Sequence, residues 1–341
     1  MPIYTSNSSS RRPKRYWRRT MLLVLILTSM ALFFWDAYND SYSLWKVGTN
    51  DSKRLWAEKR ISASQLGENG LILVGASRIQ LGVDMSSLSK LAEKKIVQLA
   101  IDGNPYMSIL EDLAADDSIV GTIIISSTVL GLSKDNNLKN RAHQYLSYYH
   151  SVVNSFYRFE SIEALLSSKL HSYIRSVSNF VTPYKWVVWP SERLVRAGYL
   201  TFNSDRSVDA DYSLIDQNFI YTKRIKRHLG ASEDLSLKLI PRFEDNIAYV
   251  NHLVSKIMGR GGRVLFIRFP TSKKIWEIDE ARYPKKQYWD VFAKKTIARA
   301  VHFKDFDILS GFDLPDGSHL DQRDKITFTE NLSEIIFLGK N

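Results

Sequence analysis

The sequence contains no cysteine among its 341 residues. This absence excludes disulfides, metal sites built on thiolates, a cysteine nucleophile and a lipidated cysteine anchor. No His-Glu-x-x-His segment is present and the seven histidines are scattered, so we expect no metal site and no cofactor. The glycine-rich segment 259–262 precedes a predicted strand and lacks a Gly-Lys-Ser/Thr ending, which excludes a phosphate-binding loop.

Negative charge is absent from the chain before Asp36. Six basic residues in this segment supply more than half of the formal net charge of +11. They are Arg11, Arg12, Lys14, Arg15, Arg18 and Arg19. Because the basic excess is confined to one end of the chain, directly ahead of an apolar run, we expect no nucleic-acid partner.

The apolar run extends from Met21 to Trp35 without a charge. With its flanks it approaches the ~20 residues that span a bilayer, so we predict a transmembrane anchor over 20–38 behind a basic cytoplasmic tail over 1–19. The arginines before the run and Asp36 after it orient the remainder of the chain to the extracytoplasmic side, in the periplasm or at the cell surface. A cleaved signal peptide is the alternative, since the strictly apolar core is short.

Short apolar runs alternate with helical patterns through the remainder of the chain. We expect a polar stalk over 39–69 and then one domain over 70–338. Five runs have the length and β-branched content of buried strands, namely 71–74, 96–101, 122–126, 264–269 and 301–306. Amphipathic helices are predicted between them, the clearest over 243–258. This alternation predicts an α/β fold with three α/β/α layers and a parallel sheet of about five strands, of the flavodoxin-like type.

The pattern is interrupted between the third and fourth predicted strands, over about 135–240. This stretch is mostly helical and rich in aromatic residues, and we interpret it as a cap inserted into the domain. Its tyrosines and tryptophans suit either stacking on sugar rings or the cap's own core. The basic run over 223–228 within it is predicted to be a solvated helix face.

Two short motifs about 240 residues apart carry the chemistry. Gly75-Ala76-Ser77-Arg78 places Ser77 after a buried strand, at the edge where parallel α/β sheets build their ligand sites. Asp316-Gly317-Ser318-His319 places a carboxylate three residues before a histidine, which it can orient. Together they supply a nucleophile, a general base and an orienting group. Each motif also has a plainer alternative, a helix N-cap for Ser77 and a surface turn for 316–319.

Gly103 follows the second predicted strand at the same edge of the sheet. Its N–H can face an oxyanion, or the glycine can simply serve a turn. Gly103 and the two motifs together resemble the SGNH (GDSL-like) hydrolase superfamily. Gly75–Arg78 is similar to the first block of that family, Gly103 to the glycine of its second block, and the 316–319 motif to its final Asp-x-x-His. The resemblance covers roughly 70–135 and 240–338.

The resemblance implies a triad of Ser77, His319 and Asp316, with an oxyanion hole formed by the N–H groups of Ser77 and Gly103. It implies serine-dependent acyl-ester chemistry, either O-acetyl transfer to a cell-surface polysaccharide or O-acetyl ester hydrolysis from one. The likeness is greatest to membrane-anchored, extracytoplasmic members linked to bacterial polysaccharide O-acetylation. A glycan substrate and an acyl donor or membrane acyltransferase partner are therefore expected.

One part of the family pattern is missing. The third block of the family gives an asparagine to the oxyanion hole after strand three, where this chain has Ser126-Ser127-Thr128. Asn136 and Asn137 come later and match poorly, and Asn104 is a substitute donor by position. Removal of one oxyanion donor typically lowers the rate ~10²–10³-fold, so the oxyanion hole is the weakest part of the match.

Two arginines at the same edge are predicted to bind substrate. Arg78 follows the serine, and Arg268 ends the fourth predicted strand, where a structural ion pair is the alternative. The alternative function is a catalytically silent module that binds glycan or protein in a polysaccharide export or modification complex. A distance of at most about 3–4 Å between Ser77 Oγ and His319 Nε2 would favour the enzyme, and one beyond about 8 Å the silent module.

Overall fold

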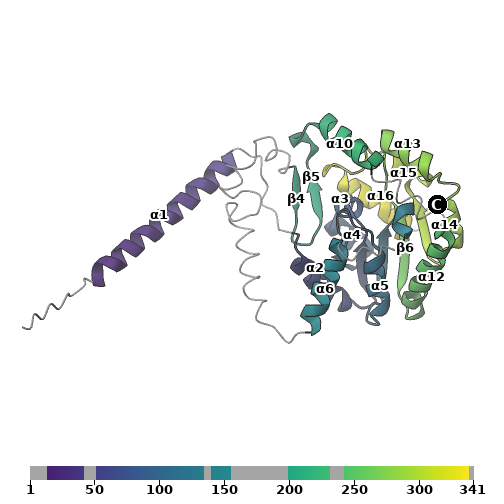
Figure 1. The fold of residues 1–341 in the computed structure, drawn as a ribbon, viewed down its shortest axis with the longest axis horizontal. Helices are drawn as coiled ribbons and strands as arrows, with labels where there is room; N and C mark the ends of the chain where they lie inside the picture. Colours follow the sequence, from purple (N-terminus) through teal and green to yellow (C-terminus); the bar gives the residue numbers. More distant parts are fainter. Residues whose placement is uncertain (1–13, 42–50, 134–139, 155–198, 231–241, 338–341) are drawn as a thin grey trace, which may run out of the picture.

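A five-stranded sheet, all of it parallel, is the centre of the fold, with the strand order β2-β1-β3-β6-β7 (Figure 1). The computed structural model describes residues 14–41, 51–133, 140–154, 199–230 and 242–337. The strands are β1 (Gly70–Val74), β2 (Lys95–Gln98), β3 (Thr122–Ser126), β6 (Arg263–Arg268) and β7 (Arg299–His302). The predicted α/β fold with a parallel sheet of about five strands is confirmed. Because β1 is followed by β2 on one side and β3 on the other, the chain reverses direction at β1, where such sheets bind ligands.

Both faces of the sheet are covered, which explains why β1 is apolar at every position after its first glycine. Ile72 and Val74 face one apolar core and Leu71 and Leu73 face the other. Side chains alternate between the two faces of a strand, so a strand covered on both sides must be apolar throughout. The last predicted strand, 301–306, is displaced. β7 ends at His302, and a 3₁₀ turn, η5 (Phe303–Asp305), follows it.

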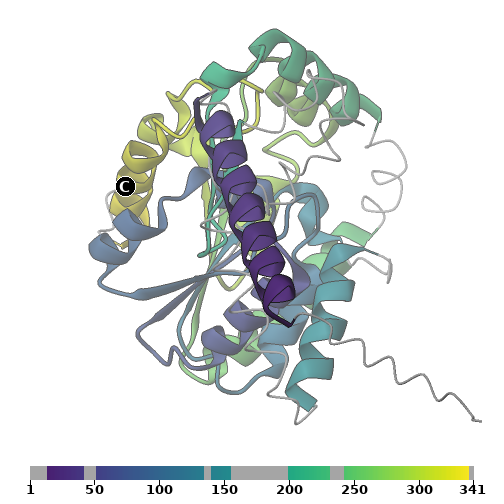
Figure 2. The same ribbon diagram turned by 90° about the vertical axis from the view of Figure 1, so that its left-hand side faces the viewer.

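Helices form a layer on each face of the sheet (Figure 2). One layer holds α2 (Lys53–Ser64), α5 (Met107–Ala115), α6 (Arg141–Asn154), α12 (Phe243–Gly259) and α14 (Trp289–Lys295). The other holds α3 (Ser77–Gly82), α4 (Met85–Ala92), α15 (Asp307–Ser310) and α16 (Lys325–Phe337). The predicted amphipathic helix over 243–258 matches α12, whose Val250, Val254 and Ile257 are fully buried. Each such side chain stabilises the fold by roughly 1.5–3 kcal/mol.

α2 corrects the predicted stalk over 39–69. Trp56 of α2 is fully buried in the core, and its Nε1 donates to the carbonyl of Leu99 at 2.9 Å. Arg60, one turn later, is 1% exposed and forms a 2.6 Å ion pair with Asp112 of α5. A segment with a buried tryptophan and a buried ion pair belongs to the core, so residues 53–64 are part of the domain. Because this helix has few apolar residues, its sequence does not show which face is buried.

Between β3 and β6 lies the segment that we predicted to be an insertion, about 135–240. Its described parts are α6, the hairpin β4 (Leu200–Phe202) and β5 (Val208–Ala210), η3 (Tyr212–Leu214) and α10 (Gln217–Gly230). Tyr145 and Tyr149 of α6 pack against Trp56 with ring centroids 6.2 and 6.3 Å away, which makes them core residues. The aromatic residues at 184–189 lie outside the described residues, as do Asn136 and Asn137.

The described part of the N-terminal segment forms the helix α1 (Lys14–Ser41), which lies apart from the sheet in Figure 1. Residues 14–19 of the predicted basic tail belong to this helix. Across the described ranges, α1 included, no helix combines the length and the apolar character that a membrane crossing requires. The anchor predicted over 20–38 therefore finds no support in the structure.

Arg206 joins the insertion to the sheet. Its side chain is fully buried and donates to the Asp51 carboxylate at 2.7 and 3.1 Å. It also donates to the carbonyls of Gln98 and Ala100, at 2.9 and 3.0 Å, at the end of β2. Two of these four contacts hold the segment that leads to Gly103, and the other two hold Asp51.

We expect Arg206→Ala to lower the free energy of unfolding by about 3–5 kcal/mol, because it leaves a carboxylate and two carbonyls without their buried partner. Urea denaturation followed by circular dichroism measures this loss. Arg323→Ala is the matched control, since Arg323 pairs with Asp321 but its side chain is 67% exposed, and its loss should be much smaller. Equal losses in the two variants would contradict the role given to Arg206.

Candidate active site

Ser77 stands at the carboxyl end of β1, as the first residue of α3. The turn between strand and helix requires a glycine at position 75, where φ is +143°. A Cβ there would also lie 2.8 Å from Cβ and 2.9 Å from the carbonyl oxygen of Ser126 on β3. The N-cap of α3 is Ala76, so the N-cap alternative for Ser77 is wrong. The Ser77 hydroxyl is left for another partner.

That partner is His319, which comes from a distant part of the chain. Its Nε2 lies 2.8 Å from Ser77 Oγ, and its Nδ1 lies 2.8 Å from Asp316 Oδ2. His319 is 4% exposed and Asp316 is fully buried, so the pair is shielded from water. The two sequence motifs therefore meet, and the surface-turn alternative for 316–319 is wrong.

The local sequence builds the turn that presents this histidine. Asp316 Oδ1 accepts the backbone N–H of Ser318 at 2.9 Å and of His319 at 2.8 Å, which leaves Oδ2 for the imidazole. Gly317 has φ of +78°, and a Cβ on it would lie 2.8 Å from Ile275 and 3.0 Å from the ring of Tyr221. Glycine is required there because the turn is left-handed and closely covered.

Electrostatics keep Asp316 charged and His319 neutral. Burial would raise the pKa of Asp316, but its interaction and hydrogen bond with His319 and the charge of Arg224 hold that pKa well below its usual range. Burial lowers the pKa of His319 below its ordinary 6.5, although Asp316 acts in the opposite direction. An ionised carboxylate can only accept, so Nδ1 carries the proton and the Nε2 lone pair faces the Ser77 hydroxyl. This is the tautomer that a general base needs.

Arg224 is a site residue that the sequence analysis missed. It lies on α10, inside the run over 223–228 that we predicted to be a solvated helix face. Its Nη2 donates to Asp316 Oδ2 at 2.8 Å and lies 3.2 Å from His319 Nδ1. His228, four residues later on the same face, pairs with Asp279 of α13 (Lys273–Arg282) at 2.6 Å. The solvated-face prediction is therefore wrong for Arg224 and His228, and their i, i+4 spacing was the available signal.

A backbone hydrogen bond positions two of the predicted oxyanion donors, Ser77 and Gly103, relative to each other. The Ile101 N–H donates to the carbonyl of Gly75 at 3.0 Å, which brings the loop containing Gly103 beside the turn containing Ser77. Ser77 begins its helix, so its N–H has no partner within that helix. The Asn104 amide is engaged elsewhere. Its Nδ2 donates to Asp102 O at 2.9 Å and its Oδ1 accepts from Ala142 N at 3.3 Å, contacts that fix the loop to α6. They give no support to Asn104 as an oxyanion donor.

The end of β3, where the family pattern has an asparagine, carries hydroxyl groups. Ser127 is 1% exposed, and its Oγ contacts the hydroxyl of Tyr106 at 3.1 Å. Thr128 accepts the N–H of Gly131 at 3.2 Å. Both side chains therefore hold the loop after β3 in place.

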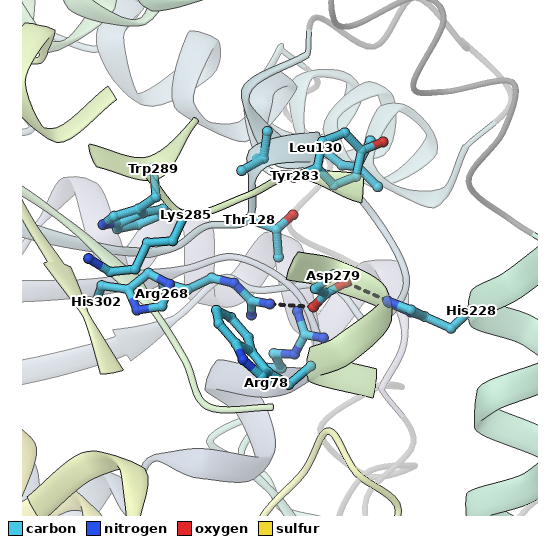
Figure 3. A pocket seen from close by; sticks show the side chains of 12 residues that line it. Arg78, Thr128, Leu130, His228, Arg268, Asp279, Tyr283, Lys285, Trp289 and His302 are labelled. Atoms are coloured by element: carbon cyan, nitrogen blue, oxygen red, sulfur yellow. Dashed lines mark hydrogen bonds and ion pairs between the residues drawn. The ribbon is translucent and has the colours of Figure 1, made fainter. Parts of the chain in front are cut away.

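The two arginines predicted to bind substrate lie side by side at the edge of the sheet (Figure 3). Arg268 is 5% exposed and forms a 2.5 Å ion pair with Asp279. A structural ion pair is the role that we gave for Arg268 as the alternative to substrate binding. Arg78 Nε donates to Ser318 Oγ at 3.1 Å, between the two triad motifs. Within the described ranges, no group of three or more His, Cys, Asp or Glu side chains is arranged to hold a metal ion.

Comparisons with models of protein families, with curated proteins and with solved structures found no match to this chain. The interpretation of the site therefore depends on its own geometry and on the motifs in the sequence.

We expect Arg224→Gln to raise the pKa of His319, because Arg224 lowers that pKa through its positive charge. Histidine ring NMR resonances recorded against pH, with His319 assigned by its loss in His319→Gln, measure the shift. Lys226→Gln is the matched control, since Lys226 is an exposed cation on the same helix. A His319 titration that is unchanged in Arg224→Gln, or shifted equally in both variants, would contradict the electrostatic role of Arg224.

Proposed function

We propose that this protein is an SGNH-type enzyme that carries out serine-dependent acyl-ester chemistry on a cell-surface polysaccharide. The observation that carries the proposal is the 2.8 Å distance between His319 Nε2 and Ser77 Oγ. It lies within the range set above for an enzyme and far from the separation expected of a silent module. The order of the motifs along the chain supports the family, and the family resemblance supports the glycan as substrate.

In the proposed reaction, Ser77 Oγ attacks the carbonyl carbon of the acyl ester while His319 Nε2 takes the hydroxyl proton. The N–H groups of Ser77 and Gly103 stabilise the oxyanion that forms. His319 then returns the proton to the departing alkoxide, which leaves an acyl group on Ser77. A second hydroxyl attacks this acyl group, gives its proton to His319 and frees the serine. Asp316 stabilises the imidazolium and keeps the imidazole oriented in both halves.

Transfer and hydrolysis differ only in the second acceptor, which is a sugar hydroxyl in the first and water in the second. Both use the same residues, so both belong to the proposal. The acyl donor, or a membrane acyltransferase that supplies it, would act in the first half. The extracytoplasmic location stays a prediction from the charge pattern around the apolar run, which cell fractionation checks.

We expect Ser77→Ala to lower kcat/KM for an aryl acetate by on the order of 10⁴-fold or more, since it removes the attacking atom. Release of the aryl alcohol by the full chain, followed by absorbance, measures this change. Ser118→Ala, at an exposed serine before β3, should retain the activity of the unmodified protein. If Ser77→Ala turns over as fast as the unmodified protein, Ser77 is not the nucleophile.

We expect kcat/KM for the same neutral ester to be constant near pH 7. At lower pH we expect kcat/KM to decrease. His319 must be neutral to accept a proton, and burial lowers its pKa below 6.5, so the loss of activity follows protonation at a pH under that value. A pH–rate profile between about pH 4 and 8 measures this decrease in activity. A limb centred above 6.5 would indicate a base other than the buried His319.

A further inference from the structure

A cavity of about 140 Å³ is lined in part by Arg78, the residue that directly follows Ser77 (Figure 3). Its aromatic walls are Trp276, Tyr283 and Trp289. By the ~10–15 Å³ that one water needs, it has room for on the order of ten waters. That volume suits a substituent or a single ring of a substrate.

The charges around the cavity are paired unevenly. Arg268 is neutralised by Asp279, to which His228 also bonds at 2.6 Å. Lys285 has two carboxylates within 2.8 Å, those of Asp290 and Asp305. Arg78 is the cation among the described lining residues that has no carboxylate within ion-pair distance.

Arg78 is also short of hydrogen-bond partners. Its Nε donates to Ser318 Oγ at 3.1 Å. Among the described residues, neither of its two terminal nitrogens has a hydrogen-bond partner. Burial and the neighbouring charge of Arg268 lower the pKa of Arg78 to about 9, so the guanidinium remains charged at neutral pH. This half-buried guanidinium therefore keeps two donor groups free for an acceptor of opposite charge.

His302 adds a neutral donor to the same wall. Burial and the charges of Arg268 and Lys285 lower the pKa of His302 to about 2, so the imidazole is uncharged. Its Nδ1 accepts the N–H of Lys304 at 3.1 Å, which leaves the proton on Nε2. The cavity therefore combines one unpaired cation, one neutral donor and aromatic walls.

We propose that this cavity binds an anionic substituent, a carboxylate or a phosphate, of the acyl-bearing substrate, with Arg78 as its ion-pair partner. Arg78 directly follows Ser77 and holds Ser318 beside His319, so an anion bound there fixes the substrate next to the nucleophile. The shared chemistry is an oxyanion that can accept two N–H groups from a guanidinium. The inference deepens the proposed function and rests on it for the identity of the substrate.

The test is equilibrium binding to the full chain, followed by tryptophan fluorescence because Trp276 and Trp289 line the cavity. The probes are D-glucuronate, glucose 6-phosphate and, as the neutral match, glucose. We expect both anions, or one of them, to bind the unmodified protein more tightly than glucose. Whichever anion binds more tightly identifies carboxylate or phosphate as the preferred group.

Arg78→Gln should weaken binding of the preferred anion by on the order of 10- to 100-fold, the loss of a charge-assisted hydrogen bond, and leave glucose unchanged. Arg263→Gln is the matched control, since Arg263 is an exposed cation at the opposite end of the strand that Arg268 completes. It should bind the anion as the unmodified protein does. Equal weakening in the two variants would overturn the proposal.

Two further measurements separate this inference from the proposed reaction. Ser77→Ala should bind the anion normally even though it cannot turn over an ester, so failure of the chemistry and failure of the binding site are distinguishable. If Arg78→Gln does not fold, the comparison of anion and glucose binding to the unmodified protein still tests the proposal. Binding of glucose as tight as that of both anions would overturn the proposal without any variant.

Discussion

The buried carboxylate of Asp316 is the group on which the rest of the site depends. Its Oδ1 closes the turn through two backbone N–H groups, and its Oδ2 holds His319 and Arg224. A fully buried carboxylate is tolerated only when its acceptor positions are filled, and here four donors fill them. The same bonds fix the imidazole in the tautomer that leaves Nε2 directed at Ser77. The same contacts therefore stabilise this turn and hold His319 in the orientation that catalysis requires.

Three separate parts of the chain converge on this turn. Arg78 reaches Ser318 from the first motif, and Arg224 reaches Asp316 from the insertion. The N–H of Ser272, after β6, donates to the carbonyl of Gly317 at 3.0 Å. Because α10 supplies both Arg224 and the ring of Tyr221 that covers Gly317, the insertion completes the site as well as covering it.

Local signals in the sequence predicted the sheet and the place of Ser77 at its edge, and the resemblance to the SGNH family predicted that Ser77 meets His319. Strands buried on two faces read as short apolar runs, and parallel strands place the residues that follow them at one edge. Arg224 could not be predicted in the same way. Its partner Asp316 lies 92 residues away, and in sequence Arg224 is one cation in a basic run. α2 was missed for a related reason, since Trp56 and Arg60 are buried by contacts with Leu99 and Asp112 that only the folded chain reveals.

The central claim is that His319 activates Ser77 as a nucleophile, and covalent trapping tests it most directly. A fluorophosphonate is added to the unmodified full chain and to His319→Gln, and the modified residue is located by mass spectrometry of peptides. We expect one adduct, on Ser77, in the unmodified protein and its loss in His319→Gln. Absence of an adduct on Ser77, or equal labelling in the two proteins, would contradict the account.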